Sequence, residues 1–183
     1  MKIVVGLLAI FAIGAVGFRG MVGDRLAVVP EVDVQRYMGL WYAVASIPTT
    51  FERACVQGTT AEYHLLASGQ IEVNNTCSRE DGSPLVANGR AWVPDPSEPT
   101  KLKVSFVRFL GRWFFPGDYW ILDLASDYSY AVVGHPQRTY GWILSRTPML
   151  PEETLEGIFK RLEAKGYDRD AFRRIDQSIH SGG

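Results

Sequence analysis

The sequence predicts an all-β domain, an eight-stranded antiparallel up-and-down β-barrel with one C-terminal α-helix packed outside it. Strand-like segments follow one another at short intervals from Trp41 to Arg146, and a single later segment has helical periodicity. A meander of about eight strands hides its edges best by closing on itself, and a barrel of that size encloses about one small ligand. The predicted fold therefore provides for a binding cavity.

Residues 1–17 have the features of an export signal. Lys2 precedes an uncharged apolar run over residues 3–18, and Ala15 and Gly17 suit the small-residue positions before a cleavage site. The run is short for a membrane span, so we expect a cleaved signal peptide, with a retained membrane anchor or a buried helix as alternatives. We expect export to the periplasm or cell envelope, with membrane association through this segment if it is retained.

We expect a lead-in over residues 18–31, one domain over residues 32–177 and a flexible tail over residues 178–183. A chain of 183 residues that is 46% hydrophobic suffices for one well-packed domain. Its formal net charge of -1 and mixed charges leave no basic stripe for a phosphate backbone, which argues against nucleic acid as a partner. Aromatic residues make up 12%, which suits a large core or an apolar cavity.

The stretch Gly39-Leu40-Trp41-Tyr42 opens the first strand. Gly39 frees the backbone two residues before Trp41, and the strand-like run from Ala43 to Ile47 follows directly. This pattern predicts a large side chain buried in an enclosed core at the start of a strand.

Two cysteines flank a predicted hairpin. Its strands cover Val56 to Leu66 and Gln70 to Asn75, with a turn at residues 67–69. In an oxidising compartment, Cys55 and Cys77 favour a disulfide.

The spacing of these cysteines requires an irregular hairpin. A simple antiparallel pairing about Ser68 sets Cys55 opposite about residue 81, so a bulge or a slipped register must bring Cys77 close. Two free thiols or a metal site are the alternatives, and the metal site is the weaker because no His or further Cys lies at ligand spacing.

Five further strands complete the meander. Residues 101–108 alternate cleanly, which places Leu102, Val104 and Phe106 on one dry face. The remaining predicted strands cover Val86 to Val93, Asp118 to Ala125, Tyr130 to His135 and Tyr140 to Arg146.

Residues 151–162 predict an amphipathic helix outside the barrel. The segment begins with acidic residues, ends with basic ones and carries a single apolar stripe made of Leu155, Ile158, Phe159 and Leu162. Gly166 ends the helix, and we expect the polar tail from Tyr167 onwards to be loosely held.

Three separated motifs resemble those of the lipocalins. They are Gly39-Leu40-Trp41-Tyr42 before the first strand, Asp127-Tyr128 in the turn after the sixth, and Arg146 closing the eighth. The resemblance covers about residues 32–175, and three motifs in register are far more specific than any one of them.

Longer segments are similar to one branch of that family. Residues 37–42, 117–122 and 142–148 resemble bacterial lipocalins, plant temperature-induced lipocalins and apolipoprotein D. Bacterial relatives often carry a lipoprotein-type Cys after the signal, whereas the first Cys of this chain is Cys55. The resemblance therefore does not extend to outer-membrane anchoring.

The resemblance implies that Trp41 lies at the closed end of the barrel with Arg146 packed across its ring. A guanidinium sheltered over an indole gains about 1 to 2 kcal/mol. Gly39, Asp127 and Tyr128 belong to the same end, and we expect all five residues to support the fold without touching a ligand.

If the first strand leaves the closed end, the connections after strands one, three, five and seven lie at an open mouth. They cover residues 48–52, 79–84, 110–116 and 136–139. The third carries three consecutive aromatic residues, which are costly to leave in water. Folding inwards as a lid, dipping into a membrane surface and packing against the barrel are all open to it. The predicted mouth-loop site residues are Phe51, Arg112, Trp113 and Phe114.

Strand parity predicts the cavity lining. Ala45 and Ile47 share the face of Trp41, and Tyr140 shares that of Trp142. A bulge would reverse the faces beyond it. The predicted ligand-binding residues are Tyr63, Val73, Val104, Phe106, Tyr119, Ile121, Val133, Trp142 and Leu144.

Such a lining predicts a lipid carrier. It would stabilise an acyl chain by about 0.8 kcal/mol per methylene group, while Tyr63, Tyr119 and Arg108 orient a polar head. The alternative is a fully packed barrel, against which the small residues at positions 43, 45, 89 and 91 argue. We expect a monomer or homodimer that binds and transports or stores a fatty acid, lysophospholipid or similar lipid in cell-envelope lipid maintenance.

Sequence motifs for catalysis are lacking. The chain has no nucleophile elbow, phosphate loop or metal-ligand spacing, and His64, His135 and His180 are isolated from one another. We therefore expect no enzyme activity, no cofactor and no metal. The alternative function is a lipocalin-type enzyme with isomerase or epoxide chemistry on a hydrophobic substrate, which would need an acid in the cavity.

Overall fold

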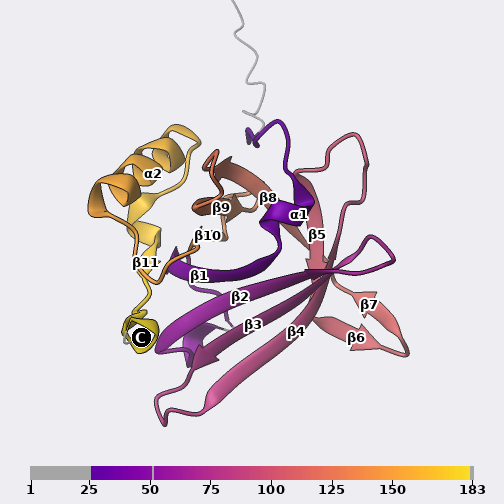
Figure 1. The fold of residues 1–183 in the computed structure, drawn as a ribbon, viewed down its shortest axis with the longest axis horizontal. Coiled ribbons are helices and arrows are strands. Elements are labelled where there is room, and N and C mark those ends of the chain that lie inside the picture. Colours follow the sequence, from indigo (N-terminus) through magenta and orange to yellow (C-terminus); the bar gives the residue numbers. More distant parts are fainter. Residues whose placement is uncertain (1–25, 51, 182–183) are drawn as a thin grey trace, which may run out of the picture.

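The computed structural model describes residues 26–50 and 52–181 (Figure 1). The expected signal segment over residues 1–17, most of the expected lead-in and Phe51 lie outside the described residues. Within the part of the chain that the structure describes, no helix has the length and apolar character needed to cross a membrane.

Eight antiparallel strands form a closed barrel (Figure 1). Neighbours in the barrel are neighbours along the chain, and the last strand pairs with the first to close the sheet. The strands are β1 (Gly39–Ser46), β2 (Gln57–Leu65), β3 (Ile71–Ser78), β4 (Pro84–Trp92), β5 (Lys101–Ser105), β8 (Gly117–Leu124), β9 (Tyr130–Gly134) and β10 (Gly141–Ser145). The predicted fold class is confirmed.

A bulge in β1 corrects the predicted facing of Ala45 and Ile47. The register between β1 and β10 shifts between Ala43 and Ala45. Ala43 packs inside the barrel, whereas Ala45 and Ile47 pack in the layer between the sheet and the C-terminal helix. The inward assignment of Ala45 and Ile47 is wrong because one extra residue reverses every face beyond it.

The strand predicted over residues 101–108 is shorter than expected. β5 ends at Ser105, whose hydroxyl accepts a hydrogen bond from the backbone N–H of Val107 and donates one to the carbonyl of Phe114. The chain then forms a separate two-stranded hairpin from β6 (Val107–Phe109) and β7 (Arg112–Phe114). A side chain that bonds the backbone so close to its own position competes with the sheet ladder.

The hairpin of β2 and β3 is irregular, as its cysteine spacing required. Pairing is centred on Ser68 up to Thr60, and the register shifts between Gln57 and Thr60. The short helix η1 (Glu52–Ala54) then turns the chain so that Cys55 and Cys77 form a disulfide with Cα atoms 5.6 Å apart. The predicted disulfide is confirmed.

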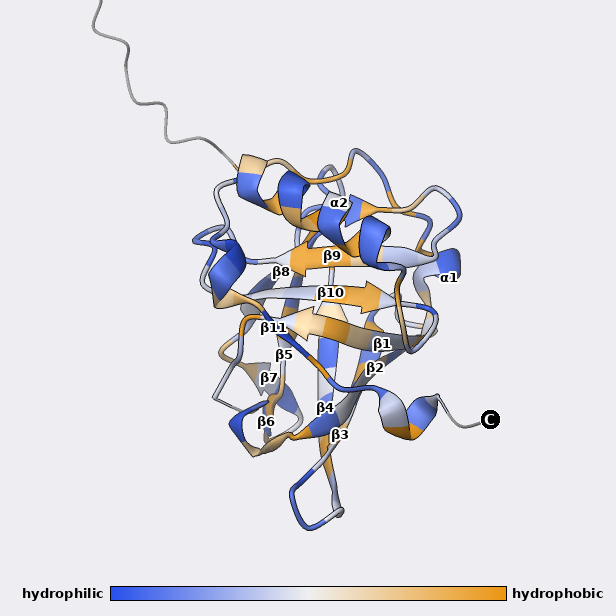
Figure 2. Cartoon of the chain, turned by 90° about the vertical axis from the view of Figure 1, so that its left-hand side faces the viewer, coloured by the Kyte–Doolittle hydropathy of each residue, from blue (hydrophilic) through white to orange (hydrophobic). Residues whose placement is uncertain are grey.

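The helix α2 (Glu152–Ala164) lies outside the barrel beside β9 and β10 (Figure 2). Its buried stripe is the predicted one, and it packs on apolar side chains of the sheet such as Val132 and Ile143. Gly166 follows with a φ of +82°, and its N–H donates to the carbonyl of Glu163. The predicted helix and its end are confirmed.

The tail from Tyr167 is not loosely held, contrary to expectation. Tyr167 is buried, β11 (Arg173–Arg174) pairs with β1, and Ile175 packs on the barrel interior. The buried amide of Gln177 donates to the carbonyls of Ala43 and Thr59, at 2.7 and 2.8 Å. The polar composition of the tail suggested loose attachment, but the polar side chain of Gln177 bonds the backbone where β1 and β2 separate. Two short helices, η2 (Arg169–Ala171) and η3 (Ser178–His180), complete the tail.

Candidate functional site

The closed end of the barrel is built on the contact between Trp41 and Arg146. Trp41 is fully buried, and the guanidinium carbon of Arg146 lies 3.7 Å from the centroid of the indole ring. The guanidinium also donates to three backbone carbonyls within residues 36–40, at 2.7 to 2.8 Å. These bonds hold the segment before β1 across the bottom of the barrel.

The other motif residues lie at the same end. The hydroxyl of Tyr128 accepts a hydrogen bond from the N–H of Asp33 at 2.7 Å. Asp127 accepts one from the N–H of Ser129, and this bond lowers the pKa of the Asp127 carboxyl. Gly39 has a φ of +90°, a conformation that favours glycine. The structure thus brings the five motif residues together.

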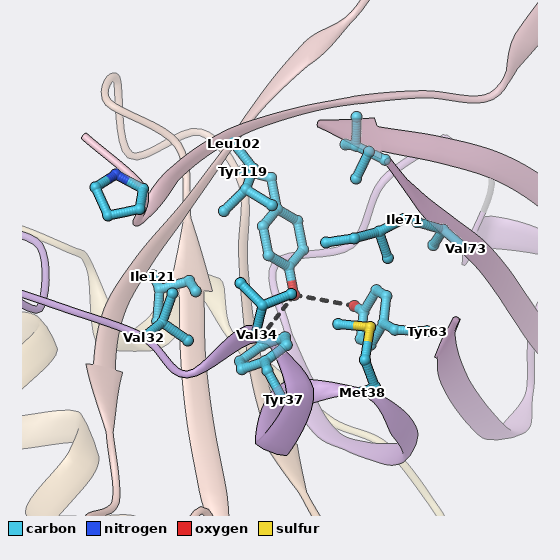
Figure 3. Close-up of a pocket in the computed structure, with 13 residues that line it drawn as sticks. Val32, Val34, Tyr37, Met38, Tyr63, Ile71, Val73, Leu102, Tyr119 and Ile121 are labelled. Carbon is cyan, nitrogen blue, oxygen red and sulfur yellow. Dashed lines mark hydrogen bonds between the residues drawn. The ribbon is translucent and has the colours of Figure 1, made fainter. Parts of the chain in front are cut away.

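An apolar cavity lies between the barrel wall and α1 (Val34–Tyr37), as Figure 3 shows. Its volume is about 20 Å³, room for about one water molecule, so the side chains that line it nearly fill it. Five of the nine predicted ligand-binding residues line it: Tyr63, Val73, Val104, Tyr119 and Ile121. The other lining residues are Val32, Val34, Tyr37, Met38, Ile71, Ala91, Pro99 and Leu102. All thirteen are uncharged, and none of the five motif residues is among them.

The remaining predicted ligand-binding residues lie elsewhere. Val133 and Leu144 are buried in the interior cluster, and Trp142 packs against it, but none of them lines this cavity. Phe106 is 43% exposed, and its ring occupies the space over Gly89. Gly89 lies opposite Val73 and shares the inner face of β4 with Ala91, so Phe106 faces the barrel interior beyond this cavity.

Sequence analysis missed the segment that closes the cavity from below. Asp33 caps the single turn of α1, because its carboxylate accepts hydrogen bonds from the backbone N–H groups of Gln35 and Arg36. Val34, Tyr37 and Met38 then point into the cavity (Figure 3). The signal was present, since an Asp cap precedes apolar residues at helical spacing.

Three tyrosine hydroxyls meet at the cavity, in what we term the tyrosine cluster (Tyr37, Tyr63 and Tyr119). The hydroxyl of Tyr119 lies 2.9 Å from that of Tyr37 and 2.9 Å from that of Tyr63 (Figure 3). Burial raises the pKa of Tyr63 to about 12 and raises those of Tyr37 and Tyr119 well above the ordinary value. All three phenols are therefore neutral over the physiological pH range.

The aromatic mouth loop forms the hairpin of β6 and β7 and packs on the outside of the barrel. Because Ala91 faces the interior, its neighbour Arg90 faces outwards, and the Arg90 guanidinium carbon lies 5.7 Å from the Trp113 ring centroid. The predicted mouth-loop residues Arg112, Trp113 and Phe114 line a shallow surface pocket. Gln70 and Trp92 complete its lining. Trp113 therefore does not cover the cavity as a lid.

The first mouth loop is tied to the barrel by one side-chain contact. The indole Nε1 of Trp142 donates to Oε1 of Glu52 at 3.0 Å, and Oε2 of Glu52 accepts from the N–H of Thr49. The predicted site residue Phe51 lies between these residues in the sequence and outside the described residues.

The cavity is suited to burying apolar groups. Its lining has no carboxylate, imidazole or amine, and three phenols are its only polar side chains. Within the described ranges, no cluster of three or more His, Cys, Asp or Glu residues could hold a metal ion. An apolar molecule with few polar atoms is the kind of ligand that such a lining suits.

Known proteins share this architecture. A family model described as a lipocalin-like domain matches residues 32–177. Temperature-induced lipocalin-1 of Arabidopsis thaliana is 40% identical over 158 residues, which cover 84% of each chain. The outer membrane lipoprotein Blc of Vibrio cholerae is 34% identical over 151 residues, which cover 81% of this chain and 85% of that one.

A solved structure is similar to this chain as well. Insecticyanin from the tobacco hornworm Manduca sexta is similar with a TM-score of 0.65 and 25% identity, over 82% of this chain and 84% of that one. The family model covers most of the chain, and it spans the barrel, the closed end with Trp41 and Arg146, and the outer helix. The chain belongs to the lipocalin family.

Proposed function

We propose that this lipocalin binds a small hydrophobic ligand in its barrel and transports or stores it. The observation that carries the proposal is the cavity lined by thirteen uncharged residues, all of which are apolar except three tyrosines. Burying a methylene group there is worth about 0.8 kcal/mol, and this gain has to offset the displacement of lining side chains, because the unoccupied cavity is small. Fatty acids and lysophospholipids are the ligand class we propose, in maintenance of cell-envelope lipids.

Two measurements test the carrier function. Native mass spectrometry of the protein purified from membranes should show a lipid adduct and report whether the protein is a monomer or a homodimer. A fluorescent fatty acid should bind and be displaced by unlabelled lipid. A protein that shows neither an adduct nor displacement is not a lipid carrier.

We further propose that the hairpin of β6 and β7 contacts a membrane surface. Phe109, Leu110 and Phe115 are 64%, 86% and 85% exposed, and Arg108 and Arg112 lie beside them in the sequence. Apolar side chains flanked by arginines suit the boundary between lipid tails and phosphate head groups. The hairpin lies beside the open end of the barrel, where a ligand would pass between protein and membrane.

Asparagine substitutions test the hairpin without breaking its backbone. Leu110 and Phe115 have φ values of +45° and +53°, and Asn tolerates this left-handed region better than other polar residues. The double variant Leu110→Asn/Phe115→Asn should co-sediment less with anionic vesicles, whereas Met149→Asn, at another exposed apolar position, should behave as the unmodified protein. Equal co-sedimentation of all three would contradict membrane contact.

The N-terminal segment supports the proposed location. Its charge and apolar run are those of an export signal, and the similar Vibrio cholerae protein is named an outer membrane lipoprotein. We propose export to the periplasm or cell envelope. Fractionation of expressing cells, with N-terminal sequencing of the product, tests both export and cleavage after Gly17.

A further inference from the structure

The tyrosine cluster has one more donor than it uses. Tyr37, Tyr63 and Tyr119 carry three phenolic protons, and the three oxygens share two hydrogen bonds, both to Tyr119. Whichever oxygen donates in each bond, one O–H remains without an acceptor inside the cluster. A buried donor without an acceptor costs about 1 to 3 kcal/mol, so an oxygen atom that enters the cavity and accepts this hydrogen bond is stabilised there.

The surroundings of the cluster select a neutral acceptor over an anion. The rest of the lining is Val, Ile, Leu, Met, Ala and Pro, and no cation is among the lining residues. The nearby Arg146 has its guanidinium against the Trp41 ring and donates to three backbone carbonyls. An ionised carboxylate at the cluster would lose its hydration and gain only the attraction of Arg146, whose donors already bond backbone carbonyls. Burying it there is therefore costlier than burying a carbonyl or hydroxyl oxygen.

We propose that the tyrosine cluster is a subsite for the neutral oxygen of a hydrophobic ligand, a ketone, aldehyde or alcohol that enters the barrel with this oxygen leading. The inference rests on the proposed carrier function and adds the orientation and the head-group class of the ligand. An ionised fatty acid would bind the other way round, with its tail at the cluster and its carboxylate at the mouth.

Carbonyl infrared spectroscopy observes the hydrogen bond directly. The probe is decan-2-one labelled with ¹³C at its carbonyl, bound to the full chain. Its stretching band should lie at lower frequency than in hexane, because hydrogen bonding weakens the C=O bond. A bound band at the hexane frequency overturns the proposal, and this measurement needs no variant.

Affinities of matched probes test whether the tyrosine cluster makes the bond. Decane, decan-2-one and decanoate should each displace N-phenyl-1-naphthylamine from the barrel at pH 8. The triple variant Tyr37→Phe/Tyr63→Phe/Tyr119→Phe removes all three donors, whereas Tyr119→Phe alone would leave the other two hydroxyls free to donate. The triple variant should weaken decan-2-one binding about five- to tenfold, the value of one hydrogen bond. Decane and decanoate should change less than twofold. The control is Tyr130→Phe, which removes a hydroxyl bonded to Arg161 on the outside of the barrel and should change none of the three.

The other outcomes are decisive in different ways. Equal weakening of decane and decan-2-one by the triple variant would mean that the cluster only maintains the cavity. Equal weakening of decanoate and decan-2-one would mean that the cluster accepts an anion, and either result overturns the proposal. Failure of all three probes to displace the dye would overturn the carrier function as well. Displacement by decane with an unshifted carbonyl band would overturn the subsite alone.

Discussion

Arg146 joins two parts of the chain that are about 100 residues apart in sequence, because its guanidinium lies 3.7 Å from the Trp41 ring centroid and bonds the backbone on either side of Gly39. One side chain thereby connects the end of β10 with the segment that closes the barrel. Neither residue lines the cavity, so this contact serves stability.

Replacing Arg146 should lower stability and leave ligand affinity nearly unchanged. Arg146→Ala removes a cation–π contact and three hydrogen bonds to carbonyls, which together are worth about 2 to 4 kcal/mol. Arg146→Lys keeps the charge, but its ammonium group cannot bond three carbonyls at once as the guanidinium does. The stability of this variant should therefore lie between those of Arg146→Ala and the unmodified protein. Urea unfolding and displacement of a fluorescent fatty acid measure the two effects. A loss of affinity with an unchanged free energy of unfolding would refute this assignment.

Filling the cavity should reduce binding without unfolding the barrel. Ala91 is buried on β4 and lines the cavity, so Ala91→Leu places three further carbon atoms in the space that the ligand would occupy. We expect displacement assays to show at least a tenfold weaker affinity for an acyl probe, which corresponds to about 1.4 kcal/mol. Ala67→Leu, in the turn between β2 and β3, is the matched control. Unchanged affinity in Ala91→Leu would place the ligand elsewhere.

The tail should contribute measurably to stability through Gln177. Gln177→Ala leaves the carbonyls of Ala43 and Thr59 without their donor, and each lost hydrogen bond costs about 1 kcal/mol. The free energy of unfolding should therefore fall by about 2 kcal/mol in urea titrations. Gln137→Ala, in an exposed loop, should have no effect. A variant as stable as the unmodified protein would show that the tail is held by other contacts.

Alkaline pH should destabilise the barrel through the tyrosine cluster. Burial raises the pKa of Tyr63 from 10.0 to about 12, so between these values the unfolded chain loses this proton while the folded chain keeps it. The stabilisation is complete below pH 10 and is lost as pH rises towards 12, with a slope of about 1.4 kcal/mol per pH unit from this group. Urea unfolding at pH 9, 10 and 11 checks the slope, which should be shallower in Tyr63→Phe than in the control Tyr42→Phe.

Much of the fold could be predicted because its signals are local. Alternation of apolar and polar residues defines each strand, and the stripe from Leu155 to Leu162 defines the helix. The disulfide could be predicted as well, since the spacing of Cys55 and Cys77 on either side of a turn required a bulge that the structure contains. Each of these inferences needs only residues that are close in sequence.

The wall of the cavity was harder to predict, because strand parity fails at irregularities. The bulge after Ala43 turns Ala45 outwards, and β5 ends at Ser105, so Phe106 lies beyond the strand, over Gly89 and outside the lining of this cavity. Neither irregularity is marked by a glycine or proline at the site. Both arise from the pairing of distant strands and from side-chain bonds to the backbone, which local alternation does not contain.

The sequence by itself determined the barrel, its closed end at Trp41, the outer helix and the apolar character of the interior, since these follow from periodicity and from motifs in register. Only the tertiary structure decided where the polar atoms of the cavity meet. Tyr37, Tyr63 and Tyr119 come from α1, β2 and β8. The hydroxyl of Tyr119 lies 2.9 Å from each of the other two because the closed barrel brings three separate segments together.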